Sequence, residues 1–305
     1  MKVYDELPAL PATDKTVLTI GVFDGVHLGH QKVLNQVKQA ANDAQALSCA
    51  ITFTEHPRAV LSKNSGIKYI TSLDNKISLL KSEGLDLVIP LTFDLDLSKL
   101  RARDFCRLLK DRINLTNLII GHDFVMGFQR EGTPAVLKDI GEKQGFSVNI
   151  VDQVSNSGIR VSSTAIREAI SSGNVAVAAN YLGRLFRLEG KVTKGAGIGR
   201  KLGFPTANLD VKENRLIPGD GIYATWAYVG GTRYKSATSI GFRPTFDGND
   251  HTIEVHIIDF DQDIYDRHIE IEFFEYIREE VRFNSEKQLV DQMGLDINQT
   301  RNIMP

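Results

Sequence analysis

Two glycine-rich segments of this chain carry residue types suited to phosphate binding. The first, residues 21–30, reads Gly-Val-Phe-Asp-Gly-Val-His-Leu-Gly-His and directly follows an apolar run. The second, residues 194–208, lies far downstream and ends in Gly-Phe-Pro-Thr-Ala-Asn. Because the two segments differ chemically, they predict two separate nucleotide-dependent reactions on one polypeptide.

The first segment has the composition of a turn between a strand and a helix. In such a turn, backbone N–H groups approach phosphate oxygens closely, and the helix N-terminus adds a partial positive charge. His27 and His30 are three residues apart, so in a helical turn both could donate to one polyphosphate. An incidental or core His-x-x-His pair is the alternative, and a metal pair lacks further ligands at sensible spacing. The candidate phosphate-contacting residues here are Gly21, Phe23, Asp24, Gly25 and Gly29.

A second phosphate-binding element is expected at residues 161–167, which read Val-Ser-Ser-Thr-Ala-Ile-Arg. The hydroxyl and N–H groups of Ser163 and Thr164 could hold a phosphate at the start of a helix, and Arg167 could neutralise a departing pyrophosphate. Ordinary helix capping is the alternative for the hydroxyl residues.

The downstream segment is neither a dinucleotide fingerprint nor a Walker loop. It has glycines at Gly195, Gly197 and Gly199 and a basic residue at Lys201, but a proline soon follows and no Gly-Lys-Ser/Thr is present. A flexible hairpin is the alternative. Thr206 and Asn208 alternate, however, and in an extended segment they point to the same side. Their oxygens could complete a hard-cation site beside ATP phosphates.

The pattern of apolar runs predicts two domains. Through residues 17–151, short apolar runs alternate with helical stretches, which is typical of an α/β, Rossmann-like parallel sheet that binds ligands beyond the carboxyl ends of its strands. Through residues 188–276 the period changes to two, with Gly230 and Gly231 as a hairpin turn, and a helix is expected at the end of the chain. An antiparallel barrel or sandwich follows. The predicted domains are 1–185 and 186–305.

Composition favours small-molecule substrates in a reducing compartment. A formal net charge of -2 argues against a surface for nucleic acid or an anionic membrane. Cys49 and Cys106 lie far apart without a CxxC, so a disulfide framework or structural zinc site is not expected, and a cytoplasmic location fits. No secretion signal and no membrane span are expected, since the chain lacks a run of about 20 apolar residues.

The first segment and the Ser-Ser-Thr-x-x-Arg element together resemble the nucleotidyltransferase superfamily with the HxGH signature, and in particular the prokaryotic bifunctional riboflavin kinase/FMN adenylyltransferase family. The resemblance implies that His27 and His30 contact the ATP phosphates and that Ser163, Thr164 and Arg167 act at the leaving pyrophosphate. It also places Asp123 and Phe124 near the flavin. Glu55 replaces a proline common in the family, and residues 125–130 are less basic than usual.

Residues 203–208 resemble the riboflavin kinase signature in full. The resemblance implies that Glu254 is the catalytic base, that Thr206 and Asn208 bind Mg²⁺ beside ATP, and that Arg278 and Phe283 line the flavin side. Val255 replaces a threonine common in the family and Ser239 an asparagine. It further implies an antiparallel β-barrel kinase domain with a terminal helix.

The expected function is therefore FAD biosynthesis in two steps, each using Mg-ATP. The second domain would phosphorylate riboflavin to FMN, and the first would adenylylate FMN to FAD. Two alternatives remain. One is a riboflavin kinase with a degenerate first domain, which the departures at Glu55 and residues 125–130 motivate; the other is a non-catalytic flavin-binding or regulatory protein.

Overall fold

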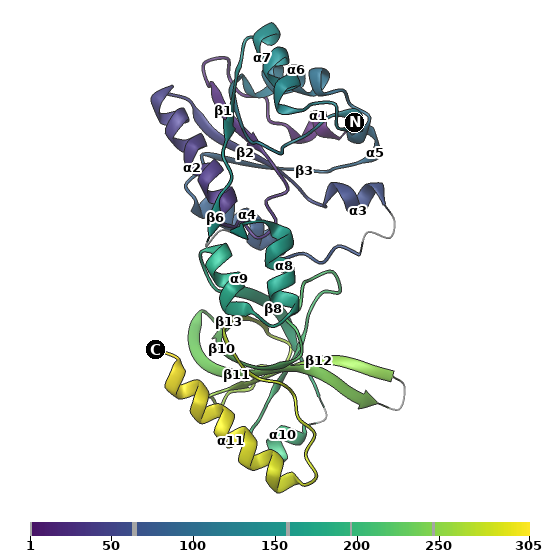
Figure 1. The fold of residues 1–305 in the computed structure, drawn as a ribbon, viewed down its shortest axis with the longest axis vertical. Helices are drawn as coiled ribbons and strands as arrows, with labels where there is room; N and C mark the ends of the chain where they lie inside the picture. The colour runs from purple at the N-terminus through teal and green to yellow at the C-terminus, as the bar shows by residue number, and fades with distance from the viewer. Residues whose placement is uncertain (1, 63–65, 157–158, 196, 246–247) are drawn as a thin grey trace. The chain divides into compact units, whose positions relative to one another are not determined.

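The computed structural model describes residues 2–62, 66–156, 159–195, 197–245 and 248–305. The chain forms two compact units (Figure 1). The first consists of Met1–Ile67 and Ser72–Ser162, and the second of Lys68–Thr71 and Ser163–Pro305.

The first unit is a parallel sheet covered by helices on both faces, as the alternating pattern predicted. Its five strands lie in the order β3-β2-β1-β4-β5. All five residues of the central strand β1 are buried, because apolar clusters pack on both faces of the sheet. The strands are β1 (Thr16–Ile20), β2 (Leu47–Phe53), β3 (Leu87–Leu91), β4 (Leu115–Gly121) and β5 (Ser147–Val151). The helices are α1 (Val3–Glu6), α2 (Leu28–Asp43), α3 (Pro57–Leu61), α4 (Leu73–Ser82), α5 (Leu95–Ser98), α6 (Ala102–Ile113) and α7 (Pro134–Gln144), with a short 3₁₀ turn η1 (Phe128–Arg130).

The strand order of this sheet places the predicted phosphate segment at the usual ligand position. Chain connections run outward in one direction from β1 to β2 and β3, and in the other from β1 to β4 and β5. Ligands of such sheets bind beyond the carboxyl ends of the strands at this reversal. Gly21 directly follows β1, and Gly121 ends the neighbouring strand β4. A two-stranded ribbon of β6 (Ser155–Asn156) and β7 (Ile159–Arg160) follows β5.

The second unit is a closed barrel, which decides between the two predicted all-β architectures. The strands run in the order β10-β11-β12-β9-β8-β13, and β13 pairs with both β8 and β10 to close the ring. Tyr223, Phe186 and Phe273 are completely or almost completely buried in its interior. The strands are β8 (Phe186–Thr193), β9 (Ala207–Asp210), β10 (Gly221–Val229), β11 (Thr232–Thr245), β12 (Gly248–Ile257) and β13 (His268–Arg278).

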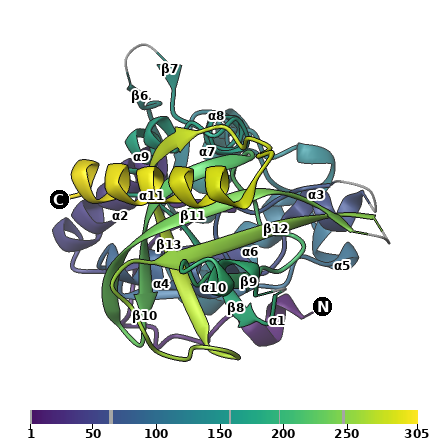
Figure 2. The same cartoon turned by 90° about the horizontal axis from the view of Figure 1, so that it is seen from below.

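Among the described residues, four helices accompany the barrel. They are α8 (Ser163–Ser171), α9 (Val175–Leu182), α10 (Ile198–Lys201) and α11 (Glu286–Ile303). The terminal helix α11 lies across the barrel (Figure 2), and its end packs through Met304 against Trp226 and Ala224. The Gly230–Gly231 turn between β10 and β11 has positive φ at both residues, as a tight hairpin requires.

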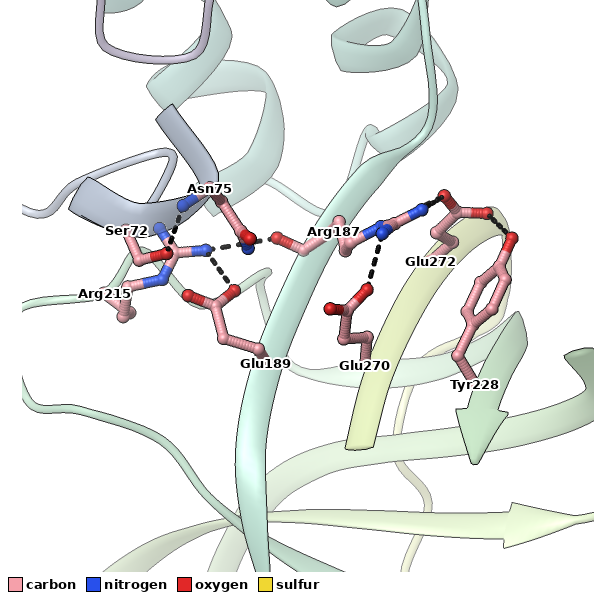
Figure 3. A network of polar contacts seen from close by, with 8 residues as sticks. All are labelled: Ser72, Asn75, Arg187, Glu189, Arg215, Tyr228, Glu270 and Glu272. Carbon is pink, nitrogen blue, oxygen red and sulfur yellow. Dashed lines mark hydrogen bonds and ion pairs between the residues drawn. The ribbon is translucent and has the colours of Figure 1, made fainter. Parts of the chain in front are cut away.

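A ladder of polar contacts joins three barrel strands on their outer side (Figure 3). The guanidinium of Arg187 on β8 lies 2.5 Å from the carboxylate of Glu270 and 2.6 Å from that of Glu272, both on β13. The hydroxyl of Tyr228 on β10 donates to Glu272 at 2.8 Å. Since these groups are only partly buried, each pair contributes at most about 1 kcal/mol, and the ladder mainly fixes strand register.

A second arginine, Arg215, is 2 % exposed and holds a distant part of the chain. Its guanidinium donates to the carbonyl of Tyr69 at 2.8 Å and to the carboxylate of Glu189 at 3.1 Å. The backbone N–H of Tyr69 donates to Asn214, and that of Leu216 donates to Tyr69. Residues 68–71 therefore belong to the barrel unit, although their neighbours in sequence belong to the parallel sheet.

The two units divide at Ser162, whereas the sequence predicts domains of 1–185 and 186–305. Helices α8 and α9 pack with the barrel unit, and α9 contacts β8 and β13. The backbone N–H of Gly219 donates to the carbonyl of Ile170 in α8 at 3.1 Å. The predicted domains were defined by the reaction that each performs. A division of the fold by contacts does not test that assignment, so it stays a prediction.

Two further features of the described residues bear on the expectations from composition. None of their helices is both long and apolar enough to cross a membrane. Cys49 and Cys106 are free and buried, and burial raises the pKa of each thiol to about 12. Both cysteines therefore pack as small buried hydrophobic residues.

The packing of α9 predicts that two fragments of the barrel unit differ in stability. A fragment 163–305 is expected to unfold at a higher urea concentration than a fragment 186–305, because the shorter one lacks four buried residues of α9, Val175, Ala178, Tyr181 and Leu182. Burial of each large apolar side chain contributes about 1.5–3 kcal/mol. Circular dichroism measures both urea midpoints, and equal midpoints would show that α9 adds nothing to the barrel.

Candidate functional site

The segment between β1 and α2 has a strained backbone. Phe23 and Val26 have φ angles of 51° and 38°, in a region that side chains other than glycine rarely adopt, and Gly25 has φ 86°. Burial holds the two strained residues in place, since Phe23 is 3 % exposed and Val26 is completely buried. The amide of Gln31 also donates to the carbonyl of Val26 at 2.9 Å. Strain of this kind gathers at functional sites, where surrounding packing enforces it.

His27 and His30 lie together, as their spacing predicted. His27 precedes α2, and its Nδ1 accepts the backbone N–H of His30 at 3.3 Å. The two rings stack with their centroids 3.6 Å apart, and Phe23 packs edge-on to His30. His27 is 6 % exposed and His30 is partly exposed. A Cβ at Gly29 would lie 3.0 Å from the His27 ring, so a side chain there would press on the stacked histidines.

A buried charge pair lies behind this segment. Asp24 is 2 % exposed and Lys76 of α4 is 5 % exposed. The Lys76 ammonium donates to the carbonyl of Phe53 at the end of β2, at 2.7 Å. Burial lowers the pKa of Lys76 to about 8, while the negative charge of Asp24 acts in the opposite direction. Sequence spacing gave no signal for Lys76, since one lysine on an amphipathic helix is usually solvated.

Asp123 belongs to a polar cluster at the neighbouring strand end. Arg160 Nη2 lies 2.5 Å from the Asp123 carboxylate, and His122 Nδ1 lies 3.6 Å from it. The amide of Gln153 lies 2.8 Å from the other nitrogen of His122. Phe124 packs, partly buried, against the core below. The sequence reasoning missed Arg160; its position just before Val-Ser-Ser-Thr was the available signal.

Ser163, Thr164 and Arg167 open α8 and belong to the barrel unit, whereas the two histidines belong to the first unit. The Arg167 guanidinium donates to the carbonyl of Lys68 at 2.9 Å. Within the first unit, a Cβ placed on Gly29 would lie 3.7 Å from the carbonyl of Val161. Val161 therefore lies beside the phosphate segment, two residues before α8 begins. That the two histidines act together with Ser163, Thr164 and Arg167 stays a prediction.

The barrel unit has a cavity of about 290 Å³ lined by strands β10, β11 and β12 and by helices α10 and α11. Three of the residues predicted for the kinase reaction line it, namely Glu254, Arg278 and Phe283. Thr206 and Gly199 of the glycine-rich segment line it as well. Its apolar wall comes partly from α11, through Leu289, Met293 and Ile297. The sequence predicted a terminal helix but not this role for it, because helical spacing does not distinguish a core face from a ligand face.

Thr206 and Glu254 are in direct contact. The Thr206 hydroxyl donates to the Glu254 carboxylate at 3.0 Å. Strand β9 pairs with β12 so that Asn208 lies opposite Glu254. The two predicted metal ligands and the predicted base thus lie in one small region of the barrel wall.

The glycines of the second segment serve different purposes. A Cβ on Gly195 would lie 2.2 Å from the Asn208 amide, and one on Gly199 would lie 2.4 Å from the Phe204 carbonyl. Both are therefore required by close packing around residues 203–208. Gly197 has φ 69° at the start of α10, in the left-handed region that favours glycine. Lys201 ends α10 and is exposed.

The side chains around Thr206 fit a magnesium ion bound together with a nucleotide. Thr206 offers a hydroxyl oxygen, Asn208 an amide oxygen and Glu254 a carboxylate, and hard cations prefer oxygen ligands of these kinds. Among the residues that the structure describes, no group of three or more His, Cys, Asp or Glu could hold a metal. Mg²⁺ commonly takes one or two protein ligands plus substrate phosphates, so this sparse set is sufficient.

A second cavity, of about 560 Å³, lies against the other side of Thr206. Thr206 lines both cavities, so it stands where they meet. The second cavity is lined mainly by the β12–β13 connection, including Phe260, Asp261, Gln262 and Tyr265, and by Arg200 of α10. The structure thus offers two adjoining spaces that share Thr206, while Glu254 lines the smaller one.

The far wall of the smaller cavity is held by an ion pair and by a hydrogen bond between two side chains. Arg278 forms a two-point contact with Asp296 of α11, at 2.9 and 2.7 Å. Ser239 donates to Glu280 at 3.1 Å. Burial raises the pKa of Glu280, and the Ser239 hydrogen bond opposes that rise. Arg278 therefore fixes α11 against β13 besides lining the cavity.

Family models match both units. Residues 10–165 match the model described as FAD synthetase, and residues 182–304 match that described as riboflavin kinase. Among curated proteins, bifunctional riboflavin kinases/FMN adenylyltransferases from Listeria monocytogenes, Buchnera aphidicola and Escherichia coli are 36 %, 35 % and 34 % identical to this chain. These alignments cover 92–93 % of this chain and 90–91 % of each relative.

A solved structure has the same fold over nearly its whole length. It is described as a macrolide-efflux protein from Streptococcus pneumoniae, and it superposes with a TM-score of 0.89 at 32 % identity. The match covers 96 % of this chain and 95 % of the other. The efflux description belongs to that protein.

Lys76 predicts a pH-dependent stability. Its pKa is about 8 when folded and near 10.5 when exposed, so between these values the unfolded chain binds more protons and the free energy of unfolding rises with pH. Lys76→Met removes this rise. From pH 8 to 10.5, the wild type should gain roughly 3 kcal/mol at most over the variant.

Urea unfolding at several pH values, followed by circular dichroism, measures this difference. The exposed Lys81 on the same helix provides the control, because Lys81→Met should leave the pH profile unchanged. Titration of the buried thiols affects wild type and variant equally. Parallel profiles for wild type and Lys76→Met would contradict the assignment.

Proposed function

Since this chain belongs to the family of bifunctional riboflavin kinases/FMN adenylyltransferases, we propose that residues 186–305 carry its phosphoryl transfer and residues 1–185 its adenylyl transfer. The enzyme phosphorylates riboflavin to FMN and converts FMN to FAD, using ATP in both steps. The observation that carries the kinase assignment is the contact between Thr206 and Glu254 where two cavities meet.

For the kinase step, riboflavin occupies the smaller cavity and ATP the larger one. The smaller cavity has apolar walls from α11 and Phe283, which suit a flavin ring, while the larger has polar groups and Arg200. Glu254 accepts the proton of the ribityl 5′-hydroxyl as its oxygen bonds to the terminal phosphorus of ATP. ADP leaves with the electrons of the broken P–O bond. Thr206, on the shared wall, lies where the phosphoryl group passes.

Thr206 and Asn208 hold Mg²⁺ in this proposal. The ion supplies charge neutralisation for the phosphate oxygens when it is bound with the nucleotide. The close packing of Gly195 on Asn208 and of Gly199 on the Phe204 carbonyl keeps both ligands in place. Backbone N–H groups of residues 195–201, with Lys201 near them, face the nucleotide phosphates in this arrangement.

For the adenylyl step, a phosphate oxygen of FMN attacks the α-phosphorus of ATP, and pyrophosphate leaves. His27 and His30 donate to the phosphates at the start of α2, where the helix adds a partial positive charge. Ser163, Thr164 and Arg167 stabilise the leaving pyrophosphate. Asp123, Phe124 and Arg160 lie beside the flavin phosphate, where Arg160 adds positive charge to that of Arg130, the one basic residue of 125–130. This step needs positioning and charge, with no covalent intermediate.

The compartment belongs to the same proposal. Two free cysteines that are both buried fit a reducing interior, so we place the enzyme in the cytoplasm with riboflavin, FMN and ATP as its partners.

Glu254→Gln is expected to lower riboflavin phosphorylation by about 10²–10⁴-fold, because the amide cannot accept the hydroxyl proton. Conversion of FMN to FAD by the same protein should change little. Chromatographic separation of riboflavin, FMN and FAD after incubation with Mg-ATP measures both steps. Loss of both activities in the folded variant would contradict separate sites.

His30→Ala is expected to produce the reverse pattern. FMN should accumulate from riboflavin at the normal rate, while FAD formation falls by about 10²-fold or more, since a phosphate donor at the developing charge is lost. Gln31→Ala, on the next residue of α2, tests whether any disturbance of this helix start has the same effect. Equal losses in both variants would refute a direct role for His30.

Thr206→Val removes the hydroxyl and retains the shape, so phosphorylation should require a higher Mg²⁺ concentration and proceed about 10-fold more slowly or worse. Thr206→Ser keeps the oxygen and should stay near the wild-type rate. Initial rates over a magnesium titration provide the comparison. An unchanged magnesium dependence in Thr206→Val would remove this residue from the metal site.

A further inference from the structure

Glu254 and His256 lie on one face of β12 and form hydrogen bonds with Thr206 and Pro205, two consecutive residues of the kinase signature. Glu254 accepts the hydroxyl hydrogen of Thr206 at 3.0 Å. His256, two positions along the strand and so on the same face, lies with its Nδ1 2.9 Å from the carbonyl of Pro205. His256 also lines the smaller cavity. None of the functional roles assigned above includes it.

The direction of this hydrogen bond is fixed by chemistry. A carbonyl oxygen only accepts, so Nδ1 of His256 carries the hydrogen whether the ring is neutral or charged. Burial lowers the pKa of His256, although the Pro205 carbonyl opposes that shift. The contact therefore does not depend on the protonation state of the ring.

The Pro205 carbonyl is the group that orients Thr206. The carbonyl of one residue and the N–H of the next lie in one rigid peptide plane. The ring of Pro205 already fixes its φ angle, so the remaining freedom is rotation of this plane. By holding the oxygen, His256 fixes the plane from which the Thr206 side chain extends toward Glu254.

The ring of His256 is itself held by the same segment. Phe204 packs edge-on against it, with ring centroids 5.8 Å apart. The backbone N–H of Phe204 donates to the carbonyl of Gly199 at 2.8 Å. The imidazole therefore lies between β12 and the glycine-rich segment, where it contacts both Phe204 and the Pro205 carbonyl.

We propose that His256 is a positioning residue for riboflavin phosphorylation, which sets the Thr206 side chain against Glu254 through the Pro205 peptide. The inference rests on the proposed function of the Thr206–Glu254 pair. His256 acts through its Nδ1–H and makes no contact with the reacting atoms.

Three substitutions in the full-length chain separate the two ring nitrogens. In His256→Asn, the amide NH₂ stands near the position of Nδ1 and can donate to Pro205, whereas in His256→Gln it stands near Nε2. His256→Leu removes both donors. The Asn variant should keep kcat within about 3-fold of wild type, and the Gln and Leu variants should lose about 10- to 100-fold, because a small displacement of a reacting-site group has this effect.

A readout apart from activity is hydrogen exchange of the backbone amides of residues 203–208. Exchange should be faster in the Leu variant and near wild type in the Asn variant, since the Pro205 carbonyl is again held. FMN-to-FAD conversion by the same samples checks that the first unit is folded, and circular dichroism checks the barrel. His268, exposed at the start of β13, gives the matched control, and His268→Leu should change neither readout.

Three results would overturn the proposal. Activity retained by the Gln variant but lost by the Asn variant would assign the effect to Nε2 and to a direct substrate contact. Equal losses in the Asn and Leu variants would show that the Nδ1 donor does not matter, and a fully active Leu variant would remove His256 from the reaction. Glu254→Gln in the same assay tests the proposed function separately, because phosphorylation that survives it refutes the base rather than the positioning residue.

Discussion

The short antiparallel pairing of β9 with β12 is the constraint on which the kinase site depends. Only two residue pairs form it, Asn208 with Glu254 and Ala207 with Val255. This pairing is non-local, and β9 is also bound on its other side by β8, so closure of the barrel fixes it. A free edge strand would allow register to slip by one residue and turn Thr206 and Asn208 to the opposite face. Barrel closure thus fixes the positions of Thr206 and Asn208, as the start of α2 fixes those of His27 and His30 in the first unit.

The two nucleotide-handling segments solve the same problem by different means. In the first, Phe23 and Val26 hold positive φ angles, and buried packing enforces the strain. In the second, Gly195 and Gly199 are needed because other atoms pass close to their Cα atoms, while Gly197 and Gly203 hold positive φ angles. Glycine-rich segments can therefore meet two different physical requirements. One is a positive φ angle, and the other is space for atoms that pass close to the Cα atom.

Local patterns in the sequence predicted most elements and the contacts within each short motif. The hairpin turn at Gly230 and Gly231 was predicted where it is observed, and the stacking of His27 with His30 follows from their spacing. The choice between barrel and sandwich depended on which strands pair, which alternation alone cannot reveal. Lys76 and the α11 cavity wall were missed for a related reason. Their roles arise from partners distant in sequence, and no spacing rule marks such partners.

The membership of Lys68–Thr71 in the barrel unit has a consequence for how the protein is made. Those residues leave the ribosome long before Asn214 and Leu216, to which the backbone of Tyr69 is bonded. The parallel-sheet unit can therefore form early only if it leaves this stretch unbonded until the barrel is synthesised. Cleavage of the finished chain after Ser162 would likewise not release two independent pieces. The N-terminal product would still contain Lys68–Thr71, which are bonded to the barrel unit.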